Sequence, residues 1–336
     1  MRLLRLRAAS VGLFLAAFAA AMGAEPPRPA GTVVDIGGRQ MHLLCEGHGS
    51  PAVILESGAG GFSVDWALAL PLIAQETRVC AYDRAGYAWS GMSAGFEQFP
   101  AAAQDLRAAL QAAGVRPPWI LVGHAMGALY ARDYQRRHPE YIAGMALVDP
   151  TPEEDFQVAM MGNTVSLIDL ADHDLRAWPV RPFVPSLTSP PPSRPGAGGR
   201  IGAPFDKLPR AMAEAHQWAL QRLLEELDRL SAEQAAAVME SERATFIDLY
   251  NARHNPATSP LKLPIVELSR GRNTTPSITQ MQDALSQLSR DEIHRTVPNS
   301  GAEIQIEAPA AVASAVQAIL HAVRSGHALS SATSAR

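Results

Sequence analysis

Apolar and polar residues alternate along the chain in two repeating patterns. Short apolar runs, typical of buried strands, are separated by stretches in which apolar residues recur every three or four positions, typical of helices. The predicted strands are 32–36, 41–45, 52–56, 77–83, 119–123, 142–149, 263–268 and 293–297. The predicted helices are 99–113, 125–138, 208–230, 232–251 and 309–323. This alternation predicts an α/β fold with a mostly parallel central sheet flanked by helices.

Glycine and proline mark where these elements are interrupted. Gly37-Gly38 between the first two strands is a hairpin signal. Prolines and glycines crowd residues 179–199, which cannot form a regular core element. We therefore predict a core of residues 25–150 and 261–324, with residues 151–260 inserted as a helical lid. The small, polar tail 325–336 is predicted to be disordered.

The first 24 residues have the layout of a secretory signal peptide. Three arginines precede an apolar stretch from Val11 to Met22, and small residues follow. The apolar part is shorter than the ~20 residues of a membrane-spanning helix. The sequence thus predicts a secreted or periplasmic protein that is free of the membrane once the signal is removed. An uncleaved anchor is the alternative interpretation.

The charge and the cysteine content limit which partners, metals and cofactors we expect. The formal net charge is −4 and becomes 26 − 33 = −7 without residues 1–24, and no basic stripe indicates nucleic acid. Cys45 and Cys80 lie in predicted strands, and an oxidising compartment favours a disulfide, but spacing leaves the pairing open. We expect no metal, because no histidine or cysteine cluster has ligand spacing. We expect no cofactor, because the glycine-rich run 58–61 is not a dinucleotide motif.

The segment Trp-Ile-Leu-Val-Gly-His-Ala-Met-Gly-Ala at 119–128 carries the most specific signal. It is a strand, a sharp turn and a helix, with Gly123 and Gly127 flanking one central residue, which is the layout of a nucleophile elbow. Its Gly-x-Ser-x-Gly pattern fails only at the centre, where Ala125 has no oxygen to attack a carbonyl. Residues 91–95 match the same pattern literally, but no strand runs into Ser93 and no helix starts there, so we interpret them as a polar loop.

With three further blocks, residues 31–324 resemble the α/β-hydrolase superfamily, and in particular its small-ester and aminopeptidase-like serine hydrolases. These blocks are the strand and oxyanion loop 53–61, the Asp-Arg loop 83–90 with Ala88 where glycine is usual, and the segment 297–304. We interpret the Asp-Arg loop as a structural turn with a satisfied Asp–Arg pair. The last block resembles the Ser-Gly-His-x-Ile segment of the family, with Ala302 at the histidine position. The resemblance also implies an oxyanion hole formed by the backbone amides of Ala59 and Met126.

The acid of a catalytic triad can be placed at two strand ends. The position after the strand that follows the lid falls on Arg272 and Asn273, and asparagine is not an acid. The position after the preceding strand falls on Asp149, which we favour over Asp155 or Asp283. A strand-end aspartate that caps the following turn is the structural alternative for Asp149.

Alanine at two triad positions predicts a serine hydrolase scaffold without esterase turnover, because removing these groups costs about six orders of magnitude in kcat. The alternatives are a natural pseudoenzyme that binds a ligand or partner, and an enzyme of proton-transfer chemistry, which would need a general base near the elbow. No substitute dyad is evident: His124 next to the elbow centre is predicted to be structural, Ser57 has no histidine to activate it, and His294 lies within a strand. We expect a small ester-like or partly hydrophobic ligand. The apolar lid residues that favour it, which ordinary lid packing explains equally well, are Met160, Met161, Phe183 and Trp218.

Overall fold

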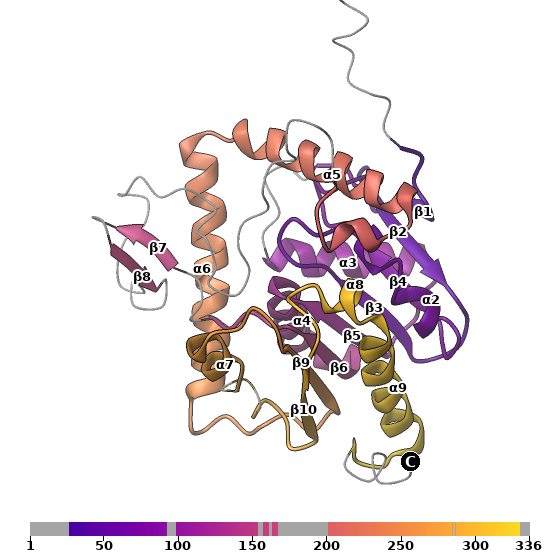
Figure 1. The fold of residues 1–336 in the computed structure, drawn as a ribbon, viewed down its shortest axis with the longest axis vertical. Helices are drawn as coiled ribbons and strands as arrows, with labels where there is room; N and C mark the ends of the chain where they lie inside the picture. Colours follow the sequence, from indigo (N-terminus) through magenta and orange to yellow (C-terminus); the bar gives the residue numbers. More distant parts are fainter. Residues whose placement is uncertain are drawn as a thin grey trace, which may run out of the picture.

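An eight-stranded sheet forms the centre of the protein (Figure 1). The computed structural model describes residues 27–92, 99–153, 157–160, 163–166, 201–283, 285 and 287–329. The strands are β1 (Thr32–Asp35), β2 (Gln40–Glu46), β3 (Ala52–Glu56), β4 (Val79–Tyr82), β5 (Trp119–His124), β6 (Ile142–Val148), β9 (Ile265–Arg270) and β10 (Glu292–Val297). Their order in the sheet is β1-β2-β4-β3-β5-β6-β9-β10. The predicted mostly parallel sheet is confirmed.

Only β2 runs against the other strands of the sheet. β1 pairs with β2, and β2 with β4, in antiparallel register, whereas every pair from β4 to β10 is parallel. The hairpin predicted at Gly37-Gly38 joins β1 to β2, and the Asp35 side chain accepts hydrogen bonds from both glycine amides. Since parallel strands end at one edge of the sheet, the loops after β3, β5, β6 and β9 meet there.

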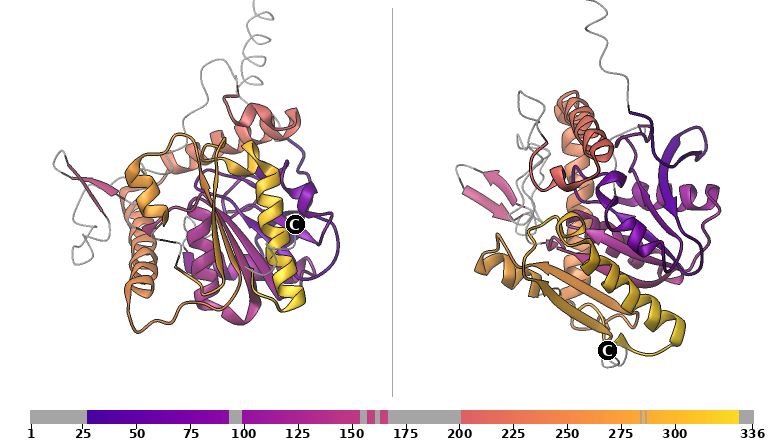
Figure 2. Two further views of the ribbon diagram at one scale, coloured as in Figure 1. Left: turned by 60° about the horizontal axis from the view of Figure 1, so that its bottom comes forward. Right: turned by 45° about the vertical axis from the view of Figure 1, so that its right-hand side comes forward.

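Helices cover both faces of the sheet (Figures 1 and 2). One face packs against α2 (Leu70–Ile73) and α9 (Pro309–Ser325), and its core includes Val53, Leu55 and Val316. The other face packs against α3 (Phe99–Ala112) and α4 (Met126–Arg137), with Ile54 and Leu121 in its core. Successive residues of β3 thus point into opposite cores, so this strand reads as a continuous apolar run.

The segment between β6 and β9 contributes two long helices, α5 (Arg210–Asp228) and α6 (Ala232–His254). In Figure 1, α5 crosses the top of the sheet and α6 descends along one side of it. α5 contacts the short helix η1 (Ser63–Trp66), and α6 packs against α3 and α4. Ser231 and Gln234 form a capping box at the start of α6. The segment also holds β7 (Gln157–Met160), β8 (Asn163–Ser166) and η5 (Phe205–Lys207).

Several short elements were not predicted from the pattern. They are η1, α2, η2 (Pro139–Tyr141), α7 (Pro276–Asp283), α8 (Ile304–Glu307) and, in the segment between β6 and β9, β7, β8 and η5. The tail predicted to be disordered begins at residue 325, and the structure describes it up to residue 329. Leu329 is fully buried, and its amide donates to Asp291. The predicted signal peptide, residues 1–24, and the proline-rich run 179–199 lie outside the described residues.

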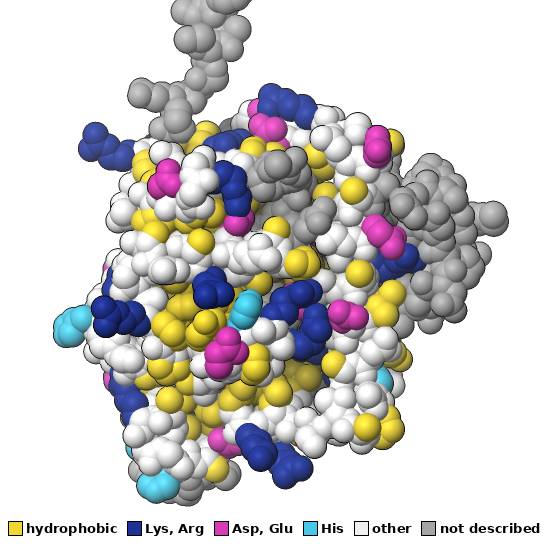
Figure 3. All heavy atoms as spheres, turned by 180° about the vertical axis from the view of Figure 1, so that it is seen from behind, with side chains coloured by type: hydrophobic (Ala, Val, Ile, Leu, Met, Phe, Trp, Pro, Cys, Tyr) yellow, Lys and Arg dark blue, Asp and Glu magenta, His cyan; other side chains and the backbone are white. Residues whose placement is uncertain are grey.

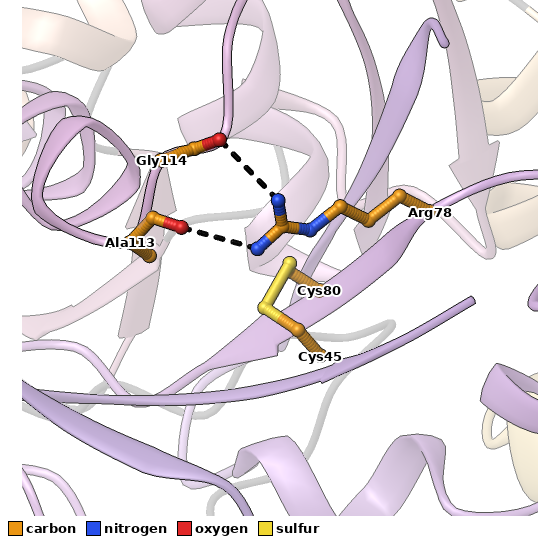
Figure 4. The surroundings of a disulfide bond; sticks show 5 residues. All are labelled: Cys45, Arg78, Cys80, Ala113 and Gly114. Carbon is orange, nitrogen blue, oxygen red and sulfur yellow. Dashed lines mark hydrogen bonds between the residues drawn. A yellow bond between two sulfur atoms is a disulfide. The ribbon is translucent and has the colours of Figure 1, made fainter. Parts of the chain in front are cut away.

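Cys45 and Cys80 form a disulfide between β2 and β4 (Figure 4). They are direct partners in the antiparallel register, with Cα atoms 4.0 Å apart. Beside them, the guanidinium of Arg78 donates to the carbonyl oxygens of Ala113 and Gly114 at the end of α3. The disulfide therefore ties the antiparallel part of the sheet to its parallel part.

Acidic and basic side chains are interspersed on the face shown in Figure 3, with apolar side chains between them.

A cluster of aromatic rings joins β5, α4 and η2. It consists of Trp119, Tyr134, His138 and Tyr141, and the guanidinium carbon of Arg107 lies 5.4 Å from the ring centroid of Tyr141. Among the described helices, none combines the length and the apolar character that a membrane span requires.

Candidate active site

The turn between β5 and α4 has the geometry of a nucleophile elbow. Ala125 is the N-cap of α4 with φ 48° and ψ −119°, a left-handed region that L-residues rarely adopt. Its amide donates to Val148 at 3.0 Å, and its carbonyl oxygen accepts from Thr151 at 3.2 Å. The side chain is buried, with 3% exposure. The backbone is thus held as an elbow by β6, although its central residue carries no oxygen.

The two glycines of the elbow are required by close backbone contacts. A Cβ placed on Gly123 would lie 2.6 Å from Cα of Ala128. A Cβ placed on Gly127 would lie 2.7 Å from the carbonyl oxygen of Ser57. Neither contact can be relieved by a side-chain rotation, because the opposing atoms belong to the backbone.

The loop after β3, predicted to supply the oxyanion hole, lies directly against the elbow. A Cβ placed on Gly58 would be 3.2 Å from Cβ of Ala125. The amides of Ala59 and Met126, the predicted donors, take no part in the backbone hydrogen bonds of the turns and loops that the structure describes. The assignment of the oxyanion hole to these two amides stays a prediction.

Hydrogen bonds from buried side chains hold this loop in place. Ser57 Oγ donates to the carbonyl oxygen of Phe62 and accepts from Trp66 Nε1, so the hydroxyl is used structurally. Arg84 donates to the carbonyl oxygens of Ser57 and Gly58 and pairs with the Glu56 carboxylate. Burial raises the pKa of Glu56, and the charge of Arg84 opposes that shift.

The Asp-Arg loop is structural, but its pairing differs from the expected one. Asp83 does not pair with Arg84: its carboxylate binds His42 Nδ1 at 2.7 Å and the amide of Ser63 at 2.8 Å. His42 Nε2 in turn binds the carbonyl oxygen of Ala30. The reason is topological, since consecutive residues at a strand end point to opposite sides of the sheet.

Ala302, at the predicted histidine position, lies next to the elbow. It is partly buried in the loop between β10 and α8. His124 Nε2 lies 3.0 Å from the Ala302 carbonyl oxygen and 3.7 Å from Oε2 of Glu303. The structure therefore brings the two alanine positions together through His124, which is buried and packs to one side as expected.

Asp149, the favoured acid position, is fully buried at the end of β6 with φ 45°. Both of its carboxylate oxygens are bound by the guanidinium of Arg270, with Nε 2.9 Å from each, and Gln282 Nε2 donates to Oδ1. This is a bidentate ion pair at the sheet edge that carries the elbow. Its catalytic role remains a prediction.

Asn273, which occupies the other acid position, faces the histidine loop. Its backbone has φ 54°, and a Cβ placed on Gly301 would lie 3.7 Å from Asn273 Nδ2. The amides of Gly271 and Arg272 donate to the carbonyl oxygen of Ser300, so this turn is fixed to the same loop. An acid at position 273 would therefore lie beside Gly301, the residue that precedes Ala302.

Other candidates are not gathered at the elbow or cannot be placed. Asp283 is an exposed partner of His294 at 3.6 Å, and His294 Nε2 lies 2.6 Å from Ser269 Oγ. Trp218 packs on Trp89 with ring centroids 5.3 Å apart. The residues outside the described parts, or without described side chains, are Ser93, Asp155, Met160, Met161 and Phe183.

A buried histidine–carboxylate pair at the site was missed in the sequence. His216 of α5 binds Asp65 of η1, with Nδ1 2.6 Å from Oδ1. Burial lowers the pKa of His216, but the charge and hydrogen bond of Asp65 and the charge of Glu303 outweigh it and raise the pKa. A single histidine in an amphipathic helix gave no signal, whereas Glu303 could have been noticed as the neighbour of Ala302. Among the described residues, no group of three or more His, Cys, Asp or Glu residues is arranged to hold a metal ion.

Sequence comparisons agree with this geometry. The family described as alpha/beta hydrolase fold matches residues 51–178. YbdG of Bacillus subtilis is 25% identical over 163 residues, which cover 48% of this chain and 50% of that protein. An AB hydrolase superfamily protein of Gibberella zeae is 30% identical over 34% of this chain and 37% of its own length. The chain thus spans half or less of these curated relatives.

Solved structures share the fold over most of the chain. Cfl2 from Burkholderia cenocepacia superposes with a TM-score of 0.58 at 18% identity and covers 85% of this chain and 93% of its own. A serine hydrolase involved in carbazole degradation, CarC, gives 0.56 at 17% identity, with coverage of 86% and 97%. With the sheet order, these likenesses show the α/β-hydrolase fold, and the family model assigns residues 51–178 to the α/β-hydrolase superfamily.

Proposed function

We propose that this protein is a carboxylic-ester hydrolase scaffold that binds ester-like ligands but lacks Ser-His turnover. The observation that carries the proposal is the elbow itself: Ala125 keeps the strained backbone of a nucleophile, and Ala302 lies beside it through His124. Neither side chain has the oxygen or nitrogen that attack and proton transfer require. The oxyanion loop against Ala125 still offers backbone amides to a carbonyl oxygen.

An apolar cluster after the oxyanion loop would form the wall of a site for a partly hydrophobic ligand. Apolar side chains of α5 and the loops beneath it form one buried cluster with Phe62, Tyr87 and Leu220. Such a wall suits the acyl or alkyl part of an ester, while the backbone amides orient its polar end. The proposed leader would deliver this protein outside the cytoplasm.

The test is hydrolysis of p-nitrophenyl acetate, butyrate and octanoate by the chain and its Ala125→Ser/Ala302→His variant. We expect the double variant to exceed the unsubstituted chain by at least about 10³-fold, because intact triads contribute about 10⁶. Each single substitution should give little, since triad members act as a unit. If the double variant is no faster than the chain itself, the proposal fails and a binding protein with a remodelled pocket is favoured.

The acid position is tested in the same double variant. Asn273→Asp should raise kcat by 10²-fold or more if the acid acts from the turn after β9, and should change little if Asp149 is the acid. This substitution is preferable to Asp149→Asn as a first test, because removing one partner of the buried Asp149–Arg270 pair costs about 3–5 kcal/mol. A loss on Asp149→Asn is therefore informative only where the variant stays folded by circular dichroism.

A further inference from the structure

The missing triad leaves a buried acid–base pair beside the elbow. His216 is 6% exposed and Asp65 is 3% exposed. They come from different parts of the chain: Asp65 follows the oxyanion loop in η1, and His216 lies on α5 in the insertion between β6 and β9. A carboxylate only accepts, so the Nδ1 that faces Asp65 carries the proton and Nε2 holds the free lone pair. This is the tautomer that a general base needs.

Asp65 is held firmly in this role. Its Oδ1 binds His216 at 2.6 Å, and its Oδ2 accepts the amide of Phe62 at 2.9 Å. The imidazole ring stacks on Phe205 with centroids 4.0 Å apart and meets Phe62 edge-on at 5.4 Å. The ring is thus fixed by the Asp65 carboxylate at Nδ1, by the stacked ring of Phe205 and by the edge-on ring of Phe62.

Close contacts connect this pair to Ala125 along the oxyanion loop. A Cβ placed on Gly58 would lie 3.2 Å from Cβ of Ala125, at one end of the loop. A Cβ placed on Gly61, at the other end, would lie 3.3 Å from Oδ2 of Asp65. The loop of four residues therefore separates the elbow from the carboxylate that holds His216.

A second connection runs through the histidine loop. His124, next to Ala125, lies 3.7 Å from Glu303, and the Glu303 carboxylate accepts from Gln305 at 2.6 Å. The charge of Glu303 also acts on His216. Gln305 Oε1 is buried without a hydrogen-bond partner among the described residues. Polar side chains of β5, of α8 and of the loop before α8 therefore lie beside the elbow.

We propose that His216, positioned by Asp65, is a general base that activates water in this pocket. This inference rests on the proposed ester-binding function. Nε2 takes a proton from a water molecule that occupies the space left by a nucleophile oxygen, and the water oxygen bonds to the ester carbonyl carbon. The carbonyl electron pair moves to its oxygen, beside the loop amides. Collapse of this adduct breaks the ester C–O bond, and the leaving alkoxide recovers the proton from Nε2.

The charged groups around the imidazole set its pH response. They are Asp65 from η1 and Glu303 from the loop before α8, while Lys207 of the adjacent η5 pairs with Glu307 instead. Both carboxylates favour the protonated imidazole. The base form therefore accumulates on the alkaline side of an ordinary histidine, and the residual hydrolysis should rise with it.

The experiment measures slow hydrolysis of p-nitrophenyl acetate by the unsubstituted chain above the buffer rate. His216→Gln should lower this excess rate by about 10²-fold, the typical contribution of a general base. The matched control is His321→Gln, an exposed helical histidine on α9. Added imidazole should restore the rate of His216→Ala with saturation, and Asp65→Asn should move the midpoint of the pH profile to lower pH.

Three outcomes would overturn the inference. They are a rate equal to buffer, a His216→Gln rate equal to that of His321→Gln, and a loss in His216→Ala that imidazole does not restore. In the Ala125→Ser/Ala302→His variant, the loss on His216→Gln should be smaller, since position 302 then supplies a base. An equal loss in both backgrounds marks His216 as structural. The ester-binding proposal is judged separately, by the activity of the double variant.

Discussion

Two glutamates on β9 and β10, one fully and one partly buried, make stability depend on pH. Glu292 is partly buried in β10, where burial raises the pKa of its carboxyl from 4.5 to about 7, against hydrogen bonds from Ser289 and Leu288. Glu267 of β9 is fully buried, and both of its oxygens lack hydrogen-bond partners among the described residues. Burial and the neighbouring charge of Glu292 raise the pKa of Glu267 well above its usual range. Both carboxyls are therefore more easily accommodated when protonated.

The perturbation is Glu292→Gln, which keeps the shape and the acceptor for the Ser289 amide, 3.0 Å away. A carboxyl with a raised folded-state pKa stabilises the fold fully below its unfolded pKa and loses that contribution as pH rises through the folded value. The shift of the pKa from 4.5 to about 7 is worth ~1.4 kcal/mol per pKa unit, or ~3.5 kcal/mol. Solvent screening of the partly exposed carboxyl reduces the cost of ionising Glu292 in the folded state to about 2–3 kcal/mol at pH 8.5. At pH 5 the difference is below ~1 kcal/mol.

The assay is thermal and urea unfolding of both proteins at pH 5 and pH 8.5. Glu292→Gln should raise Tm at pH 8.5 by roughly 4–8 °C and change it by little at pH 5. Glu46→Gln, at an exposed position on β2, is the matched control and should have no pH-dependent effect. A gain of equal size at both pH values, or a loss at pH 8.5, would refute the reasoning.

Two further predictions concern stability. Reducing the Cys45–Cys80 disulfide, which spans 35 residues, should lower the free energy of unfolding by about 4 kcal/mol, and dithiothreitol should not affect Cys45→Ala/Cys80→Ala. Equal urea midpoints for the oxidised and reduced chain would contradict this loop-closure estimate. Gly127→Ala should destabilise the fold by more than about 3 kcal/mol, because its Cβ meets the Ser57 carbonyl oxygen, whereas Gly202→Ala, with open space, should stay within ~0.5 kcal/mol in urea unfolding. A tolerated Gly127→Ala would show that the loop after β3 can yield.

The sheet could be predicted because its strands are continuous apolar runs. β3 was placed to the residue, and most other strands to within two residues, since burial on both faces leaves a plain pattern in the sequence. Short elements such as α7 and α8 were missed because one or two turns show too little periodicity. The Cys45–Cys80 pairing depends on the register between β2 and β4, which composition does not encode.

The candidate site likewise contains residues that local motifs predict and pairs that only the fold brings together. Ala125 and Ala302 were predicted as triad positions from local motifs, in which a few neighbouring residues identify the position. The Asp65–His216 pair joins residues 151 apart in the sequence, and it forms only because α5 folds over η1. The Asp149–Arg270 ion pair likewise depends on the packing of β6 against β9, so the sequence suggested a free strand-end acid instead of an occupied one.

The strained backbone at Ala125 does not depend on the side chain at that position. A left-handed conformation costs an L-residue of order 1–3 kcal/mol, and here no nucleophile benefits from it. The turn persists because β6 and the packing around Gly123 and Gly127 impose it, independently of what the central side chain is. The surrounding chain therefore sets the direction of the side chain at position 125, and the residue there sets whether that side chain carries a reactive atom. A serine introduced at this position would take up the same turn without any rebuilding of the chain around it.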